Sequence, residues 1–374
     1  MWSIALRTLA ADRGKLATAL VGVVFSIVLV NVQGGLFVGL LRKASLLVDL
    51  GQADIWVGHQ RMHNVDFPRE IPQRWVDRIR AVAGVAVAKP YRIGHCTMTL
   101  PSGGFEDVVV VGCDRASLLG GAWSVKAGGA DRIRRAQGVV VDEFELAKFD
   151  YPRLGDIREI GGRRARIVGF SQGIVGFLVT PYVFTTLEQS ARYLRTPPET
   201  CSYFLVKLEP GADAIEVRDR IRRRVPRADV FTSDEYARKS VHYWMTRTGL
   251  GISFGAATLM GLLVGLIVVA QTLYASVLDR LSEFGALKAM GAREDQIFRI
   301  LFIQATALAM SGAVLGLGLV LLIERACSAP HAPIVVPRWM SWGSCALVLM
   351  ICLISSLLPY LRIRKLDPQI VLQT

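Results

Sequence analysis

Four long stretches without a charged side chain constrain this fold more than any other feature of the sequence. Each contains no Asp, Glu, Lys or Arg. Each is also long enough to cross the hydrocarbon core of a bilayer, which takes about 20 apolar residues in a helix. The 52% hydrophobic content is therefore concentrated in segments rather than spread over a soluble core. We predict transmembrane helices at 16–41, 248–278, 300–323 and 339–361.

The first apolar stretch is predicted to be an uncleaved signal anchor. It follows the basic residues Arg7, Arg13 and Lys15, as the apolar part of a signal peptide would. It is too long for that role, however, and no A-x-A cleavage site ends it.

Basic residues in three short segments set the predicted orientation in the membrane. The segments before the first helix, between the second and third, and after the fourth are rich in Lys and Arg, and such segments stay in the cytoplasm. Both termini are therefore predicted to be cytoplasmic, with the large segment 42–247 and the short loop 324–338 outside. The predicted cytoplasmic segments are the N-terminal segment 1–15, the loop 279–299 and the tail 362–374.

The segment 42–247 has the length and composition of a folded domain that can bury its own core. Two strand–helix–strand patterns bracket a β-rich middle section. We predict an α+β domain of two βαβ-like halves around an inserted lobe at about 115–200. The expected elements are a strand at 53–57, a helix at 71–83, a hairpin of 85–100 with 106–112, a strand at 139–141, a hairpin at 156–170, a strand at 182–185, a strand at 203–208, a helix at 213–225 and a strand at 229–232.

The net charge of +13 does not indicate a nucleic-acid partner. Many of the basic residues flank the predicted membrane helices, and most others lie on the exported domain, where a basic face suits lipid headgroups, an anionic cargo or a partner protein. Of the exported cysteines, Cys96 and Cys113 are placed where they could oppose each other across a hairpin, and Cys201 leaves an odd count. The sequence does not decide whether these cysteines form a disulfide or remain free thiols.

No catalytic, cofactor-binding or metal-binding residues are predicted, and the chain is not expected to be an enzyme. A G-x-S-x-G pattern at 251–255 opens a membrane helix, whereas an activated serine needs a strand-to-helix turn. His59 and His63 lack a third metal ligand. The sequence has no P-loop, and the predicted spans hold no ionisable residue for ion coupling. Transport work would therefore draw its energy from another chain.

Small residues recur at four-residue spacing in the predicted membrane helices. Such pairs let two helix backbones approach closely in lipid. In the second helix they serve either packing within one subunit or the seam of a homodimer. The candidate packing residues there are Gly251, Gly255, Gly261 and Gly265.

The loop between the second and third helices carries the most distinctive run of the chain, residues 279–293. Leu281, Phe284, Leu287 and Met290 are three residues apart, so a short helix would present one apolar edge, and Gly291 can end it. Such a helix either lies on the lipid surface or docks in a groove of a cytosolic partner.

The run Glu283–Ala292 resembles the signature of FtsX/MacB-type (type VII) ABC transporter permeases, just after their second membrane helix. The C-terminal run Leu358–Pro368 is similar to the end of these permeases, and one helix, a large outer domain and three further helices match their layout. Around Tyr243–Trp244 and Val268–Tyr274 the chain looks closest to the DevC-like permeases of glycolipid exporters.

The resemblance implies a MacB-like periplasmic domain in a permease of the bacterial inner membrane that works by mechanotransmission. It implies a homodimer, a cytosolic ATPase of the lipoprotein-release type that holds ATP and magnesium, and a periplasmic adaptor (a membrane fusion protein) with an outer-membrane channel. Because the chain starts at its first membrane helix, the ATPase is expected on a separate chain. The implied ATPase-coupling residues are Leu281, Glu283, Phe284, Gly285, Leu287, Lys288, Met290, Gly291 and Arg293.

The expected function is export of a lipid, glycolipid or other amphiphile. Two alternatives within the family are an FtsX-like signalling permease that controls an extracellular peptidoglycan hydrolase, and a lipoprotein-releasing permease. A membrane-anchored enzyme is a third, and it is disfavoured because no nucleophile, metal cluster or carboxylate pair stands out.

Overall fold

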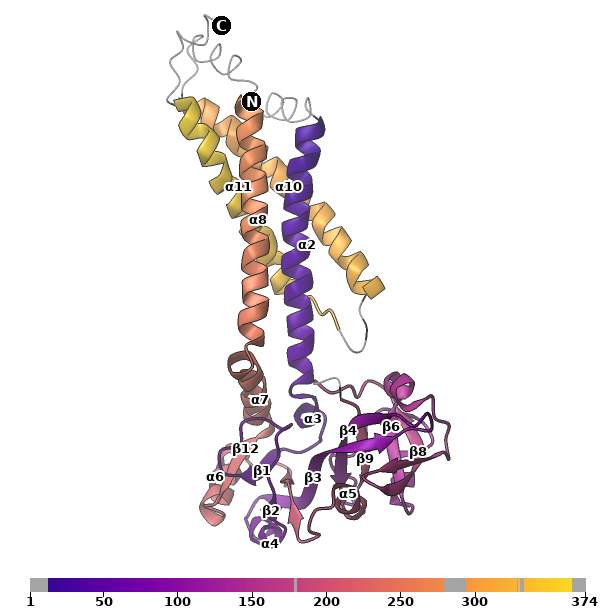
Figure 1. Cartoon of the computed structure of the whole chain (residues 1–374). Helices are drawn as coiled ribbons and strands as arrows, with labels where there is room; N and C mark the ends of the chain where they lie inside the picture. Colours follow the sequence, from indigo (N-terminus) through magenta and orange to yellow (C-terminus); the bar gives the residue numbers. More distant parts are fainter. Residues whose placement is uncertain (1–12, 178–179, 279–293, 328, 330–332, 365–374) are drawn as a thin grey trace, which may run out of the picture. The chain divides into compact units, whose positions relative to one another are not determined.

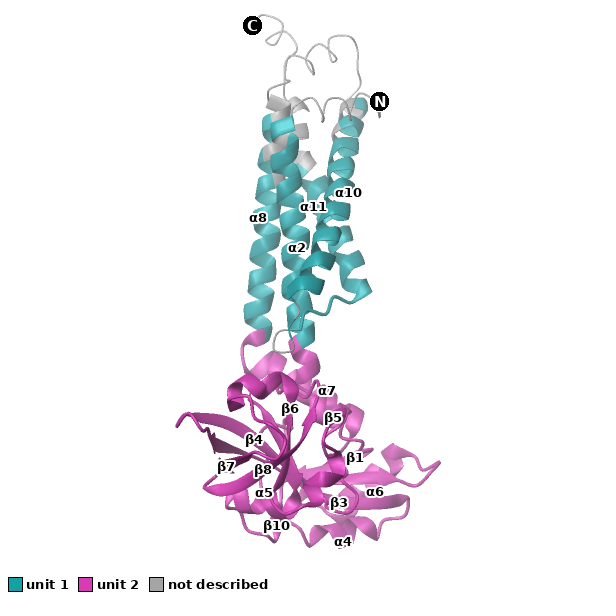
Figure 2. Cartoon of the chain, turned by 90° about the vertical axis from the view of Figure 1, so that its right-hand side faces the viewer, with its two compact units in different colours: residues 1–39, 251–374 teal, residues 40–250 magenta. Residues whose placement is uncertain are grey.

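The structure is a computed structural model, which describes residues 13–177, 180–278, 294–327, 329 and 333–364. The chain forms two compact units (Figure 2). One consists of residues 1–39 with 251–374, and the other of residues 40–250.

Long helices make up the unit of residues 1–39 and 251–374. Among the described residues, four helices are long and apolar enough to cross a membrane, at Leu16–Lys43, Leu250–Val268, Phe298–Cys327 and Arg338–Ser355. In α2, α10 and α11, small and branched side chains such as Ala19, Val23 and Ala309 form a shared apolar core. The full helices are α2 (Arg13–Lys43), α8 (Leu250–Leu278), α10 (Glu294–Cys327) and α11 (Arg338–Arg364).

Half of the 40–250 unit is an antiparallel sheet with the strand order β12-β1-β11-β3 (Figure 1). Two interleaved strand–helix–strand halves build it, which is the split βαβ arrangement of ferredoxin-like folds. Ile79 of α4 and Val217 and Ile221 of α6 pack on the same sheet residues, so both helices cover one face. The elements are β1 (Ile55–His59), α4 (Trp75–Arg80), β3 (Val85–Thr99), β11 (Tyr203–Leu208), α6 (Ala214–Arg224) and β12 (Ala228–Thr232).

The opposite face of this sheet packs against α3 (Leu46–Asp49) and α7 (Ser233–Arg247). Trp56 of β1 is the centre of an aromatic cluster with Tyr91, Tyr203 and Tyr236, whose ring centroids lie 5.6–5.7 Å from it. Burial of such large rings on both faces makes this sheet the rigid centre of the unit.

The second half of the 40–250 unit is a small barrel, and the C-terminal part of β3 is one of its strands. The end of β3 pairs with β4 on one side and with β7 on the other, and the remaining pairings β4-β9-β6-β8-β7 close the ring. Its interior is filled by side chains such as Val110, Val141 and Phe149. The elements are β4 (Phe105–Cys113), β5 (Val125–Ala127), η1 (Ala130–Arg134), β6 (Gly138–Asp142), η2 (Glu143–Phe149), β7 (Ile157–Ile160), β8 (Arg163–Ser171), β9 (Tyr182–Thr186) and α5 (Leu187–Leu194).

The four apolar helices, with the α+β domain between the first and second, confirm the predicted fold class. The lobe starts earlier than residue 115, because β3 and β4 contribute to the barrel.

One local prediction is wrong, and one question that the sequence left open is decided. The helix predicted at 71–83 is confined to α4, because Ile71–Pro72 forms β2 and pairs with β10 (Thr200–Cys201). Cys96 and Cys113 do not oppose each other, since the register of the hairpin pairs Cys96 with Val108. Cys96, Cys113 and Cys201 are all free thiols.

Candidate functional site

The candidate site is the joint through which the chain enters and leaves the 40–250 unit. The last turn of α2 leads into the unit, and α7 leads out of it, two residues before α8 begins. α7 starts at a capping box, in which the Thr232 side chain accepts from the backbone of Glu235 and the Glu235 side chain accepts from the backbone of Thr232. The start of the helix is therefore fixed.

Side chains from both helix ends pack together in this joint. Ala44, Phe177 and Trp244 are buried in one cluster, and Leu41 and Val241 pack against it. The rings of Phe177 and Trp244 lie 4.2 Å apart between centroids. Because a close-packed cluster resists deformation, a shift of α7 would carry the end of α2 and the Phe177 segment with it.

A buried carboxylate ties α7 to the barrel. Asp66 is 8% exposed, and it accepts hydrogen bonds from Trp244 Nε1 on α7 and from the hydroxyl of Tyr182 on β9, each at 3.3 Å. Burial raises the pKa of Asp66 to about 6, against the lowering effect of these two hydrogen bonds. The joint therefore holds three elements through one carboxyl group whose charge depends on pH.

The arrangement packs two helix ends around an aromatic cluster and links them to the barrel through one buried carboxyl group. Within the described part of the chain, no group of three His, Cys, Asp or Glu side chains could hold a metal ion. The polar atoms of Asp66 are satisfied by an indole and a phenol, neither of which activates a nucleophile.

The glycines predicted to serve helix packing differ in their surroundings. A Cβ on Gly261 would overlap Leu29, and one on Gly265 would overlap Ser26, so both glycines bring α8 close to α2 within the chain. A Cβ on Gly255 would meet no other atom within 4 Å in the described structure, and the half-buried Gly251 lies one turn before it. A homodimer contact through α8 stays a prediction. Gly255 is a candidate for that contact, because no other part of the described chain packs against it.

A polar contact also links the first and last membrane helices. Asn31 is fully buried in α2, and its amide donates to Ser344 Oγ on α11 at 2.8 Å. A hydrogen bond between two helices in lipid fixes their rotation as well as their distance.

All of the implied ATPase-coupling residues lie outside the described residues. They are Leu281, Glu283, Phe284, Gly285, Leu287, Lys288, Met290, Gly291 and Arg293. Their role in binding an ATPase stays a prediction.

Two protein families match this chain. The MacB-like periplasmic core domain family matches residues 16–224, and the FtsX-like permease C-terminal family matches residues 255–368. With the four apolar helices, these matches define a multi-pass membrane permease with an extracytoplasmic domain. The chain belongs to the FtsX/MacB-type family of ABC transporter permeases.

Several ABC transporter permeases are similar to this chain in sequence, at low identity. The uncharacterized ABC transporter permease MJ1507 of Methanocaldococcus jannaschii is 23% identical over 58% of this chain and 56% of its own length. The macrolide export ATP-binding/permease protein MacB of Vibrio parahaemolyticus is 27% identical over 52% of this chain and 31% of its own length. The chain thus spans about a third to somewhat over half of these relatives.

Among solved structures, the periplasmic region of MacB from Actinobacillus actinomycetemcomitans covers 49% of this chain and 90% of its own, with 11% identity and a TM-score of 0.39. The extracellular domain of the transporter YknZ from Gram-positive bacteria covers 48% of this chain and 98% of its own, with 11% identity and a TM-score of 0.37.

Sequence reasoning did not single out Asp66, Tyr182 or Phe177 as parts of the joint. Asp66 lies 116 residues from Tyr182 and 178 residues from Trp244, so no local pattern connects them. The capping box at Thr232 was the available signal for α7.

Proposed function

We propose that this permease converts ATP hydrolysis on a separate cytosolic ATPase of the lipoprotein-release type into movement of its extracytoplasmic domain. The movement exports a lipid, glycolipid or other amphiphile. The permease works as a homodimer in the bacterial inner membrane, with both termini in the cytoplasm. ATP and magnesium bind the ATPase, and a periplasmic adaptor with an outer-membrane channel carries the cargo onward, as in DevC-like exporters.

The joint is the observation that carries this proposal. The chain enters and leaves the domain through helix ends that share the cluster around Trp244, and Asp66 extends this contact to the barrel. A displacement of the membrane helices along or across the bilayer would therefore reach the whole domain instead of being absorbed by a loose linker.

We favour export over the signalling alternative because similar proteins are named as exporters. Relatives include a macrolide export protein and a pyoverdine export protein, each named as an ATP-binding/permease protein.

The proposed coupling is tested by purifying the permease with its associated proteins. A P-loop ATPase should co-purify with the wild type, and Phe284→Asp and Leu287→Asp should each abolish its binding, because a charge would be buried at an apolar docking edge. Phe105→Asp is the matched control, since Phe105 is 69% exposed in the outer domain. Binding of the ATPase to both loop variants would contradict the proposed coupling loop.

Transmission through the joint is tested with Trp244→Ala. Addition of ATP and vanadate to the complex should change hydrogen exchange at residues 60–70 and in β9 of the wild type. The variant should still bind the ATPase but should lose this response. Trp75→Ala on α4, outside the joint, should keep it. An unchanged response in Trp244→Ala would show that force reaches the domain by another route.

A further inference from the structure

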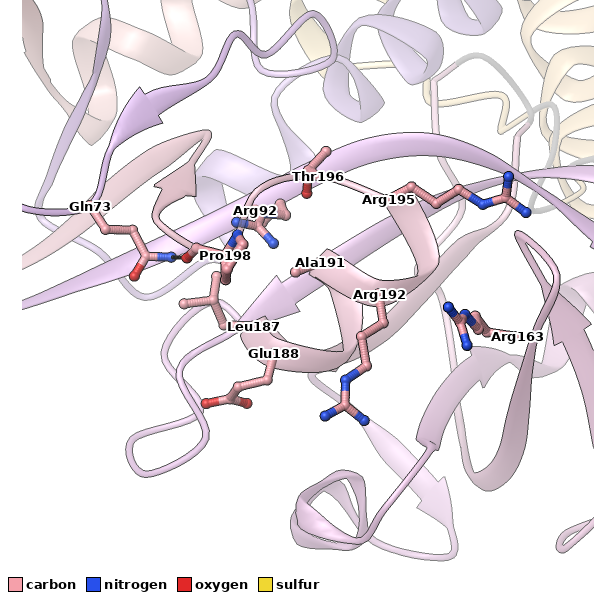
Figure 3. Close-up of a pocket in the computed structure, with 10 residues that line it drawn as sticks. All are labelled: Gln73, Arg92, Arg163, Leu187, Glu188, Ala191, Arg192, Arg195, Thr196 and Pro198. Atoms are coloured by element: carbon pink, nitrogen blue, oxygen red, sulfur yellow. Dashed lines mark hydrogen bonds between the residues drawn. The ribbon is translucent and has the colours of Figure 1, made fainter.

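A pocket of about 550 Å³ lies beside α5 in the 40–250 unit, and no joint residue is among those that line it (Figure 3). Arg92 and Pro198 are on one side of it and Arg163 and Arg192 on the other, with Ala191 of α5 between them. Pockets of this size usually accommodate small organic molecules.

The charge of the pocket is strongly positive. Arg92, Arg163, Arg192 and Arg195 line it, and Glu188 is the one acidic residue of the lining. The guanidinium groups of Arg163 and Arg192 form no ion pair or hydrogen bond with the residues that the structure describes. Both are exposed and so are available to a ligand from solvent.

Besides the positive charge of the pocket, the environment of Arg92 also indicates a ligand. This residue is 2% exposed, and its Nη2 donates to the backbone carbonyls of Pro197, at 3.0 Å, and of Thr200. Its Nη1 is buried and has no hydrogen-bond partner in the described structure. A buried guanidinium group with an unused donor is costly, and a small movement of Arg92 that brought Nη1 to an anion in the pocket would remove that cost.

The chemistry of the lining narrows the class of anion. Arginine forks match the oxygens of phosphate, and guanidinium groups on two sides suit a group with several charged oxygens. Leu187, Ala191 and Pro198 add apolar surface next to the arginines. A phosphate ester with an apolar substituent satisfies both parts of the lining.

We propose that the pocket formed by Arg92, Arg163, Arg192 and α5 binds a phosphate group carried by an amphiphile. The proposed site uses none of the joint residues and does not depend on the proposed export. A result against one proposal therefore leaves the other standing.

The test uses the full chain in nanodiscs of phosphatidylcholine, titrated in a calorimeter with hexyl phosphate and with inorganic phosphate. Empty nanodiscs provide the blank. Hexyl phosphate should bind at one site per chain and more tightly than inorganic phosphate. Equal affinities would retain the phosphate site but overturn the amphiphile, and no binding of either probe at millimolar concentration would overturn the proposal.

Two variants locate the binding. Arg92→Gln should weaken hexyl phosphate binding by about tenfold or more, as loss of a charge-assisted hydrogen bond predicts. Since Arg92 also holds the backbone of Pro197, the exposed pair Arg163→Gln with Arg192→Gln gives the same test without loss of that contact. Arg224→Gln on α6 removes a charge outside the pocket and should bind as the wild type does. Unchanged binding in the double variant, or an equal loss in Arg224→Gln, would refute the site.

Discussion

Asp66 makes the stability of the extracytoplasmic domain depend on pH, and Asp66→Asn should remove that dependence. The folded domain holds the Asp66 proton more tightly than the unfolded chain does, because burial raises the pKa from the ordinary 3.8 to about 6. The stabilising effect of the proton is complete below pH 4 and is lost as the pH rises through 6. The difference corresponds to about 3 kcal/mol at pH 7 and above.

Asparagine suits this position because it resembles the protonated carboxyl group. Its one carbonyl oxygen can accept from Trp244 Nε1, which is a donor only, while its amide can donate to the hydroxyl of Tyr182, which also accepts. At pH 7.5 the variant should therefore be more stable than the wild type by about 3 kcal/mol, and at pH 4.5 this difference should fall to about 1 kcal/mol. For a domain of this size the gain at pH 7.5 corresponds to about 6–12 °C in the melting temperature.

The assay is thermal unfolding of the full chain in nanodiscs, followed by near-ultraviolet circular dichroism between pH 4.5 and 8. Asp77→Asn serves as the control, since the Asp77 side chain is 79% exposed and should keep the wild-type pH dependence. A melting temperature of Asp66→Asn that stays below that of the wild type at pH 7.5, or follows pH as steeply, would refute the assignment of the raised pKa to this carboxyl group.

Three further predictions concern packing and burial. Gly265→Leu should lower the melting temperature, because a side chain there overlaps α2, whereas Gly255→Leu should leave the fold intact and change only the dimer fraction in size-exclusion chromatography. Asn31→Leu should cost about 0.6–2 kcal/mol by removing the hydrogen bond to Ser344, which thermal unfolding measures. Cys113 should resist maleimide at pH 8 until the protein is denatured, because burial raises its pKa to about 12, and mass spectrometry of labelled peptides checks this.

The membrane helices and the hairpin of β3 with β4 could be predicted because their signals are local. Uncharged stretches of sufficient length require helices in lipid, and a turn between two apolar runs brings adjacent strands together. The prediction of a helix at 71–83 was wrong for a physical reason. The spacing of Ile71 and Trp75 fits a helix, but pairing of Ile71 with Cys201, 130 residues away in the chain, decides its conformation.

The joint and the arginine pocket could not be derived in this way. Closure of the barrel depends on Met98 pairing with Ile160, and the burial of Asp66 depends on side chains from α7 and β9. The unpaired donor of Arg92 arises only when the 197–200 turn folds over it. Such features are products of long-range contacts, for which one sequence carries no periodic signal.

Strand β3 runs through both halves of the extracytoplasmic domain, with its start in the ferredoxin-like sheet and its end in the barrel wall. Each half needs part of β3 to complete its hydrogen bonding between strands. The barrel therefore cannot be removed as an independent domain, although most of it lies between β3 and β11 in the sequence. Amides of β3 should exchange with solvent deuterium as a single cooperative block. A destabilising change at either end would then shorten the lifetime of the whole domain, and engineering of chimeric permeases would have to exchange the two halves together.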